Sequence, residues 1–342
     1  MKTILITGGA GFIGSNFVRY LYDKYPDYYL VVLDLLTYAG NPENIPNDIK
    51  NSSRFEFWYG NVNNAGLVEM LVSKSDAVVH FAAESHVARS IFDDRIFFET
   101  DVLGTQTVAS CVLEHSHKVE RFIHISTSEV YGTALTDPMT EDHVLNPMTP
   151  YASAKAGADR LVYSYWATYQ LPAVILRPFN QYGPHQHLEK VIPRFITSAL
   201  MNEPLTVHGD GSSRRDWNFV TDTCAAIDAV LHVDIEKIKG QVINIGSGFD
   251  LDVLSIAKKI LSIMDKPLSL IEYIGDRPGQ VQHHISSINK ASDLLGWKAE
   301  TSFETGLLKT IKWYQDNPDW WQKLTWMKHV PIKTRKGSVE YY

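Results

Sequence analysis

The sequence predicts an α/β fold in which a doubly wound parallel sheet is followed by a smaller C-terminal α/β substrate lobe. In the first half of the 342-residue chain, short apolar runs alternate with stretches whose apolar residues have helical spacing. Such alternation is typical of strand–helix–strand units. After about residue 178 the alternation stops, and Gly- and Pro-rich segments become frequent. These observations favour two unequal parts with no flexible linker between them.

The expected elements follow from the apolar runs and their spacing. We expect strands at 3–7, 29–34, 55–59, 77–81, 121–126 and 173–177, and helices at 13–24, 66–72, 97–115 and 152–169. In the smaller lobe we expect helices at 191–201, 222–233 and 254–264 and a strand near 241–245. We place the first domain at residues 1–178, the smaller lobe at 179–330, from which the chain can cross back, and a tail at 331–342.

Composition indicates a globular protein and excludes several classes of function. Hydrophobic residues make up 44% of the chain and charged residues 21%, which is ordinary globular usage. The net charge of −7 disfavours a nucleic-acid or anionic-membrane surface. No apolar run approaches the ~20 residues of a membrane span, and no cationic leader opens the chain, so we expect a cytoplasmic protein. Cys111 and Cys224 lack metal-ligand spacing, and no metal is expected.

A glycine-rich turn follows the first expected strand. Gly8, Gly11 and Gly14 have the spacing that lets backbone approach a pyrophosphate at the start of a helix. Asp34 ends the next strand, 20 positions after Gly14, where a carboxylate can bind ribose hydroxyls and would repel a 2′-phosphate. The sequence therefore predicts a Rossmann-type domain that binds NAD rather than NADP. Asn61 is placed to meet the adenine, or else serves as a turn residue.

Two further stretches, 126–132 and 151–155, carry the groups for chemistry. Tyr151 and Lys155 are four residues apart on a helix and share one face, so the ammonium is expected to lower the pKa of the phenol. Beside a nicotinamide, such a base can take the proton of an alcohol. Glu129 adds a second acid–base group, which suggests chemistry on the neighbouring carbon. The cofactor site is expected to comprise Gly8, Gly11, Phe12, Ile13, Gly14, Asp34, Asn61, Val62, Ala82, Tyr151 and Lys155.

With these motifs the chain resembles the extended short-chain dehydrogenase/reductases that modify nucleotide sugars. The resemblance runs from Thr3 to about Trp297 and rests on the glycine turn, the run 80–86, the Tyr-x-x-x-Lys pair and the run 177–184. The runs 34–41, 83–86, 215–217 and 276–279 match the dTDP-glucose 4,6-dehydratases. The resemblance implies NAD, a nucleotide-diphosphate sugar as substrate and a homodimer with a helix-bundle interface. It implies substrate contacts from Glu84, Ser85, His86, Asn180, Lys190, Arg215 and Arg277.

The resemblance also implies a mechanism. Tyr151, helped by Lys155 and Thr127, would take the proton of the sugar 4-hydroxyl as C4 is oxidised. Glu129 would then remove the C5 hydrogen, water would leave from C6, and hydride would return to C6, giving a 4-keto-6-deoxy sugar. The catalytic set is Thr127, Ser128, Glu129, Tyr151 and Lys155.

One residue departs from the dTDP-glucose pattern. Those enzymes have Thr-Asp-Glu where this chain has Thr127-Ser128-Glu129. Thr-Ser-Glu resembles GDP-mannose 4,6-dehydratases and UDP-glucuronate decarboxylases, and the run 186–194 resembles legionaminic acid pathway dehydratases that act on GDP-N-acetylglucosamine. The nucleotide and sugar therefore stay open. We hypothesise that Glu129 passes its proton to the departing hydroxyl while Ser128 positions that oxygen.

Three alternatives remain at this point. A UDP-glucuronate decarboxylase would need an Arg to hold the acid, and Arg214 or Arg215 could serve. A 4-epimerase would have no use for Glu129. A redox-silent NAD-binding module would have no use for the set of Thr127, Tyr151 and Lys155.

Overall fold

The computed structural model describes residues 2–275, 279–328, 331–333 and 339–341. A seven-stranded parallel sheet forms its larger part, in the order β10-β6-β5-β4-β1-β2-β3. The strands are β1 (Lys2–Thr7), β2 (Tyr28–Asp34), β3 (Phe55–Tyr59), β4 (Ala77–His80), β5 (Arg121–Ile125), β6 (Ala173–Pro178) and β10 (Val242–Ile245). The predicted fold class is confirmed.

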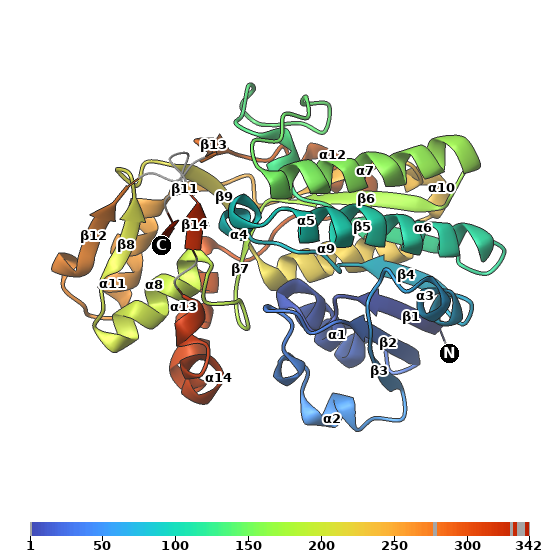
Figure 1. Ribbon diagram of the computed structural model, residues 1–342, viewed down its shortest axis with the longest axis horizontal. Helices are drawn as coiled ribbons and strands as arrows, with labels where there is room; N and C mark the ends of the chain where they lie inside the picture. Colours follow the sequence, from blue (N-terminus) through green and yellow to red (C-terminus); the bar gives the residue numbers. More distant parts are fainter. Residues whose placement is uncertain (1, 276–278, 329–330, 334–338, 342) are drawn as a thin grey trace.

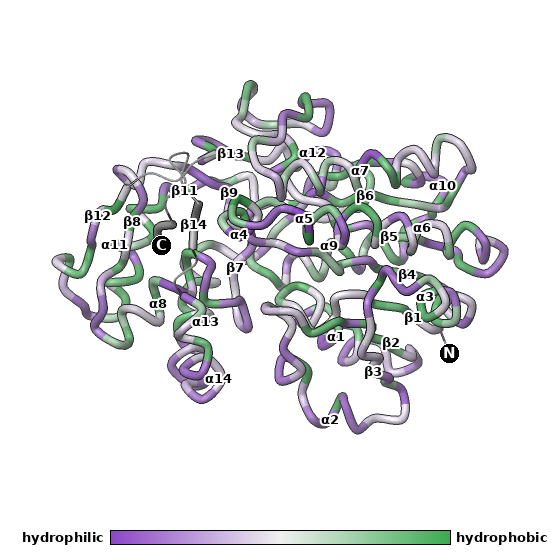
Figure 2. The backbone as a smooth tube through the Cα atoms, viewed as in Figure 1, coloured by the Kyte–Doolittle hydropathy of each residue, from purple (hydrophilic) through white to green (hydrophobic). Residues whose placement is uncertain are grey.

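Helices cover both faces of this sheet (Figure 1). One face carries α1 (Phe12–Lys24), α9 (Val220–His232) and α12 (Asn289–Leu295), and the other carries α3 (Ala65–Val72), α6 (Thr105–Glu114) and α7 (Pro150–Tyr169). In β1, Ile4 and Ile6 face the first set while Leu5 faces the second. Because both faces are buried, the strands read as continuous apolar runs rather than alternating ones. Figure 2 shows these hydrophobic residues along the strands and hydrophilic ones on outer segments such as α2 (Asn47–Lys50).

The smaller lobe lies beside the carboxyl ends of the strands. Its core joins α8 (Val191–Met201), α11 (Val253–Ile263), α13 (Phe303–Asp316) and α14 (Pro318–Gln322). Its strands are β7 (Asn180–Tyr182), β8 (Leu205–His208), β9 (Arg214–Phe219), β11 (Asp250–Asp252), β12 (Ile271–Ile274) and β13 (His283–His284). β9 pairs with β7, β11 and β13, and β8 pairs with β12.

Two elements that the sequence places in the smaller lobe belong to the larger part of the structure, one as a strand of its sheet and one as a helix packed on that sheet. β10 pairs in parallel with β6, and α9 packs against α1 through Ile227 and Val230. That prediction is wrong because the apolar faces of both elements are buried against the large sheet after the chain crosses back. The boundary at residue 178 stays a prediction.

The predicted helix at 97–115 is three segments. α5 (Arg95–Phe97) continues into a π-helical turn (Phe98–Gly104) and then into α6. Wide turns of this kind are frequent at functional sites. This one buries Asp101 completely.

Short elements complete the chain. They are α4 (Val87–Phe92), α10 (Ile235–Ile238), β14 (Pro331–Lys333), β15 (Val339–Tyr341) and single turns at Pro42–Asn44, Ser128–Tyr131, Leu268–Leu270 and Thr325–Met327. β14 and β15 pair within the segment predicted as a tail, and residues 334–338 lie outside the described residues. In the part of the chain that is described, no helix is both long and apolar enough to cross a membrane.

The tryptophans near the C-terminus attach α14 to the body of the protein. Trp320 and Trp321 are buried. Trp320 donates from Nε1 to Oδ1 of Asn44 at 2.9 Å, and Trp321 donates to the Tyr314 carbonyl at 2.8 Å. Trp326 is 72% exposed, so it takes no part in this packing.

A buried ionic network ties β5, β6 and α7 together. Arg177 on β6 donates to both carboxylate oxygens of Asp159 on α7, each at 2.9 Å. Ser126, directly after β5, donates to Asp159 at 2.7 Å. Arg160 also pairs with Asp159, but its side chain is 42% exposed.

We expect Arg177→Met to lower the free energy of unfolding by about 3–5 kcal/mol, because it leaves a buried carboxylate without its bidentate partner. Arg160→Met is the matched control and should cost at most about 1 kcal/mol, since the Arg160 side chain is partly in solvent and Arg177 still bonds both oxygens of Asp159. Urea unfolding followed by circular dichroism measures both. Equal losses in the two variants would contradict this reading of the network.

Candidate active site

The turn after β1 brings two strand ends close together. Gly8 has a φ of +70°, and a Cβ on it would lie 2.6 Å from the backbone nitrogen of Ala82, in the loop after β4. A Cβ on Gly14 would collide with the Gly8 carbonyl oxygen. Side chains at these positions would fill the space at the amino end of α1. The glycines leave a backbone cradle that fits a diphosphate.

Asp34 ends β2 beside this cradle. Its carboxylate accepts hydrogen bonds from the backbone amides of Ala10 at 2.9 Å and Leu36 at 2.8 Å. Burial raises its pKa, and these two amides oppose the rise. Each carboxylate oxygen keeps a second lone pair. The turn and the carboxylate together fit the diphosphate and ribose hydroxyls of NAD.

Asn61 serves the turn after β3. Its side-chain oxygen accepts a hydrogen bond from the Asn63 amide at 2.8 Å. Asn61 and the neighbouring Val62 also line the cavity that begins at the glycine turn. The structural role expected as the alternative for Asn61 is therefore present, and a contact with adenine stays a prediction.

The turn Ser128–Tyr131 follows β5 immediately. Thr127 caps it by accepting a hydrogen bond from the Glu129 amide at 3.2 Å. Ser128 is buried, with its Oγ 3.4 Å from Nδ1 of His284. Consequently Thr127, Ser128 and Glu129 reach the cavity from one strand end.

Local sequence also fixes the start of α7. Thr149 accepts a hydrogen bond from the Ala152 amide at 3.2 Å, and Pro150 occupies the first turn. Tyr151 and Lys155 are therefore one helical turn apart, and both are buried. The Lys155 ammonium donates to the Ile125 carbonyl oxygen at 2.7 Å.

The predicted lowering of the Tyr151 pKa is wrong. Burial raises the pKa of this phenol, the Asp101 carboxylate raises it further, and a hydrogen bond with Thr127 only partly opposes them. Burial also lowers the pKa of Lys155, against the charges of Asp101 and Asp159. The spacing of Tyr and Lys reveals a shared face, but it does not reveal burial or a neighbouring carboxylate.

Asp101 is a site residue that sequence reasoning missed. Its Oδ1 accepts a hydrogen bond from the Glu84 amide at 2.8 Å. Burial raises its pKa to about 8, against the charge of Lys155. Its other carboxylate oxygen has no hydrogen-bond partner among the described residues. No spacing in the sequence points to it, because the π-helical turn brings it beside Lys155.

The loop after β4 and the start of α8 form the opposite wall. Lys190 donates to the Ser85 carbonyl oxygen at 2.7 Å. His86 caps α4 by accepting from the Arg89 amide at 3.3 Å. Arg215 on β9 donates to the Val281 carbonyl oxygen at 2.6 Å. Main-chain contacts thus hold the cationic groups at this end of the cavity.

Glu189 was also missed by sequence reasoning. Arg89 donates to it at 3.0 Å, and Nε2 of His86 lies 4.0 Å from it. Burial opposes its ionisation, but the charges of His86, Lys190, His187 and Arg89 lower its pKa to about 2. This carboxylate therefore balances the cations around it. Its signal in the sequence is the run of charged residues and histidines at 185–190.

One cavity of about 450 Å³ brings these groups together. Its described lining includes every predicted site residue except Arg277, which lies outside the described residues: Gly8, Gly11, Phe12, Ile13, Gly14, Asp34, Asn61, Val62, Ala82, Glu84, Ser85, His86, Thr127, Ser128, Glu129, Tyr151, Lys155, Asn180, Lys190 and Arg215. Across the described ranges, no group of three or more His, Cys, Asp or Glu could hold a metal ion.

Comparison with known proteins agrees with this arrangement. A family described as GDP-mannose 4,6 dehydratase matches residues 5–310. The low-salt glycan biosynthesis protein Agl12 of Haloferax volcanii is 46% identical over 91% of this chain and 98% of its own. A dTDP-glucose 4,6-dehydratase of Mycobacterium tuberculosis is 40% identical over 94% of this chain and 96% of its own.

Solved structures extend the comparison. DesIV, a dTDP-glucose 4,6-dehydratase of Streptomyces venezuelae solved with NAD bound, has a TM-score of 0.89 and 40% identity over 94% of this chain and 100% of its own. A UDP-glucuronic acid 4-epimerase of Bacillus cereus, solved with NAD and UDP-glucuronic acid, has a TM-score of 0.86 and 31% identity over 92% and 99% of the two chains. The chain belongs to the GDP-mannose 4,6-dehydratase family and is an NAD-dependent nucleotide-sugar 4,6-dehydratase with the extended short-chain dehydrogenase/reductase fold.

Proposed function

We propose that Tyr151 and Glu129 divide the dehydration of a nucleoside-diphosphate hexose between them. The observation that carries this division is the presence of both side chains in one cavity, from the start of α7 and the end of β5. NAD, when bound, would supply a positive charge beside the phenol, accept hydride from C4 and return it to C6.

Tyr151 takes the proton of the 4-hydroxyl as the C4–H bond breaks, and a ketone forms at C4. Thr127 holds the phenol oxygen, and Lys155 keeps positive charge beneath it. The ketone acidifies the C5 hydrogen. Glu129 removes this proton and delivers it to the C6 oxygen, so that a C5–C6 double bond forms, the C6–O bond breaks and water leaves. Glu129 then takes a proton from solvent and gives it to C5 when hydride is returned to C6.

The nucleotide end is proposed to lie against the cations on the smaller lobe. Lys190 and Arg215 are fixed by main-chain carbonyls and suit the charge of a diphosphate. Asn180 opens β7 at the same wall. Glu84, Ser85 and His86 follow β4, at the end of the sheet where the sugar is expected. These contacts support a nucleoside-diphosphate sugar as the ligand.

The arginines bear on the decarboxylase alternative. Arg214 pairs with Asp250 at 2.5 Å, and its side chain is 51% exposed, so it is engaged away from the chemistry. Arg215 faces the cavity and is assigned above to the diphosphate. These assignments leave neither arginine for a sugar carboxylate and favour dehydration over decarboxylation of a uronate.

We also propose that the protein acts in the cytoplasm as a homodimer. In support, the π-helical turn and α7 carry exposed apolar side chains: Phe98, Leu103, Tyr163 and Tyr169. Sedimentation equilibrium should give a mass near twice 38.7 kDa, and a monomer at micromolar concentration would refute the dimer.

Incubation with UDP-, GDP- and dTDP-linked hexoses in deuterated water tests the reaction. We expect one of them to lose water and to gain solvent deuterium at C5, because Glu129 exchanges its proton with solvent. Mass spectrometry reads both changes. Loss of carbon dioxide from a uronate would show a decarboxylase, and unchanged mass with inverted C4 would show an epimerase.

We expect Glu129→Gln to slow water loss by about 10²–10⁴-fold, because it removes the only proposed acid–base group at C5. The affinity for NAD should stay within about twofold, since the glycine turn and Asp34 are untouched. Calorimetric titration with NAD provides the control. Unchanged water loss in this variant would remove Glu129 from the mechanism.

Asp101→Asn should shift the acidic limb of the pH–kcat profile to lower pH. The ionised Asp101 carboxylate raises the Tyr151 pKa, so above the Asp101 pKa of about 8, where this charge is present, its removal favours the phenolate at a lower pH. Asn keeps the acceptor for the Glu84 amide. Asp93→Asn, on the exposed end of α4, is the matched control and should leave the limb in place. An unshifted limb in Asp101→Asn would contradict the proposed coupling.

A further inference from the structure

His284 contacts the site from the smaller lobe, and its contacts bear on the missing second carboxylate. Its side chain is completely buried, and its ring meets Phe179 edge-on with centroids 5.9 Å apart. Nδ1 lies 3.4 Å from Oγ of Ser128, and Nε2 contacts the carbonyl oxygen of Gly132. Ser128 and Gly132 bracket Glu129 in the sequence. The imidazole therefore supports both ends of the catalytic turn.

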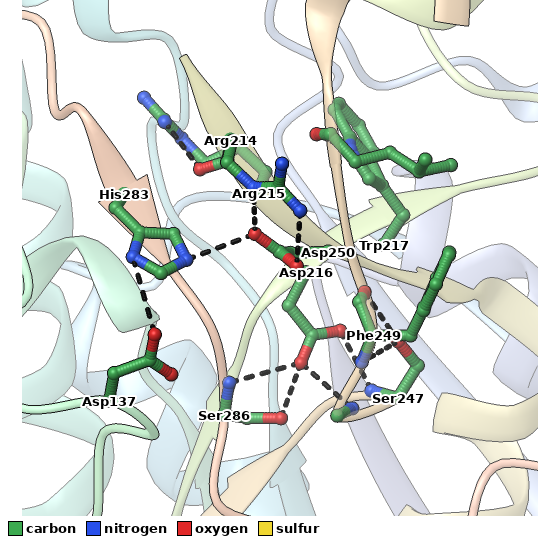
Figure 3. Close-up of polar contacts among 12 residues, drawn as sticks. Asp137, Arg214, Arg215, Asp216, Trp217, Ser247, Phe249, Asp250, His283 and Ser286 are labelled. Atoms are coloured by element: carbon green, nitrogen blue, oxygen red, sulfur yellow. Dashed lines mark hydrogen bonds and ion pairs between the residues drawn. The ribbon is translucent and has the colours of Figure 1, made fainter. Parts of the chain in front are cut away.

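The strand that carries His284 is anchored on both sides (Figure 3). His283 lies 3.0 Å from the Asp250 carboxylate, which also pairs with Arg214. The buried Asp216 accepts from the Ser286 amide at 3.1 Å and from its hydroxyl. These bonds fix β13 on β9, where His284 pairs with Arg215. The position of the imidazole is thus set by the smaller lobe.

The partners of the ring determine its tautomer. A carbonyl oxygen only accepts, so Nε2 must carry the proton that bonds to Gly132. Gly132 has a φ of +68°, which suits glycine, and a side chain there would collide with the backbone oxygen of Asn146. The tight packing around Gly132 therefore fixes the Gly132 carbonyl oxygen that Nε2 contacts. Burial lowers the pKa of His284, with Glu129 opposing and Arg215 adding to the effect. In the neutral ring Nδ1 is then an acceptor, and the Ser128 hydroxyl is the donor between them.

We propose that His284 is a positioning residue that makes Ser128 a hydrogen-bond acceptor toward the sugar, an inference that rests on the proposed dehydration. With its proton directed to Nδ1, Ser128 presents oxygen lone pairs to the cavity. Ser128 accepts the O–H of the 6-hydroxyl, which turns a lone pair of that oxygen toward Glu129. When the C6–O bond breaks, its electron pair stays with oxygen, and Glu129 supplies the proton that completes water. Ser128 and His284 keep their own protons throughout.

Two substitutions test the acceptor nitrogen Nδ1 and the donor nitrogen Nε2 of His284 separately. In His284→Asn the amide oxygen can lie where Nδ1 lies and accept from Ser128. In His284→Gln the longer amide can bond to Gly132 but offers no acceptor at Nδ1. We expect His284→Gln to lose about tenfold in the rate of water loss with KM within about twofold, and His284→Asn to stay within about threefold of wild type. His117→Asn, at an exposed position in the turn after α6, is the matched control.

A partition experiment distinguishes positioning from a general loss of structure. In deuterated water, Glu129 still removes the C5 proton in His284→Gln, but departure of the hydroxyl is slow. Recovered substrate should therefore carry more C5 deuterium per water lost than with wild type. A variant that lowers exchange and water loss equally would overturn the proposal. So would an additive loss in Ser128→Ala/His284→Gln, since the two residues should act as one unit.

A measurement without substrate tests the geometry even if no hexose turns over. Nitrogen-15 shifts of the His284 ring, assigned by their loss in His284→Gln, should show a protonated Nε2 and an unprotonated Nδ1 at neutral pH. Ser128→Ala should move the Nδ1 resonance and leave Nε2 in place. The opposite tautomer would refute the proposal. A correct tautomer together with a wild type that removes no water would instead refute the proposed function.

Discussion

The buried carboxylate of Asp159 holds the two halves of the reaction centre in register. It lies one turn after Lys155 on α7 and bonds to Ser126, the residue just before Thr127. The bidentate Arg177 compensates its charge and fixes the next strand as well. A buried carboxylate is costly without such partners. Once they are in place, the helix that carries Tyr151 cannot slide along the strand end that carries Glu129.

The sheet supplies the other constraint. Strand order reverses between β1 and β4, so the loops that follow these strands separate and leave a crevice at the carboxyl edge. Gly8 and Ala82 border that crevice in near contact. The smaller lobe then closes it with β7, β9 and the start of α8. Cofactor and sugar positions are thus built from different parts of the chain, which meet only in the folded protein.

Within this frame the reaction centre has one well-placed acid–base carboxylate. Ser128 cannot replace a second acid, because an aliphatic hydroxyl does not give up its proton at neutral pH. Its bond to His284 instead gives it a direction, and a directed acceptor can orient a leaving group for Glu129. Asp101 plays a different part from the opposite side, since its charge opposes ionisation of Tyr151. The positions of the charged groups around Tyr151 and Glu129, rather than the number of acids, then determine which proton is transferred.

The sequence by itself determined the fold class, the glycine turn, Asp34 and the pair of catalytic stretches, because each depends on spacing within one strand, turn or helix. Apolar runs, a Tyr and Lys four apart, and a Thr–Pro helix start are local properties that survive without tertiary context. The sequence pattern placed β10 and α9 in the smaller lobe instead of with the large sheet, and it predicted a lowered pKa for Tyr151 where burial raises it. Those features depend on which faces become buried and which charges meet. Asp101 enters the site through a π-helical turn, and His284 arrives from 156 residues beyond Ser128. Only the tertiary structure decides such contacts, because burial and long-range pairing have no signature in the spacing of a single chain.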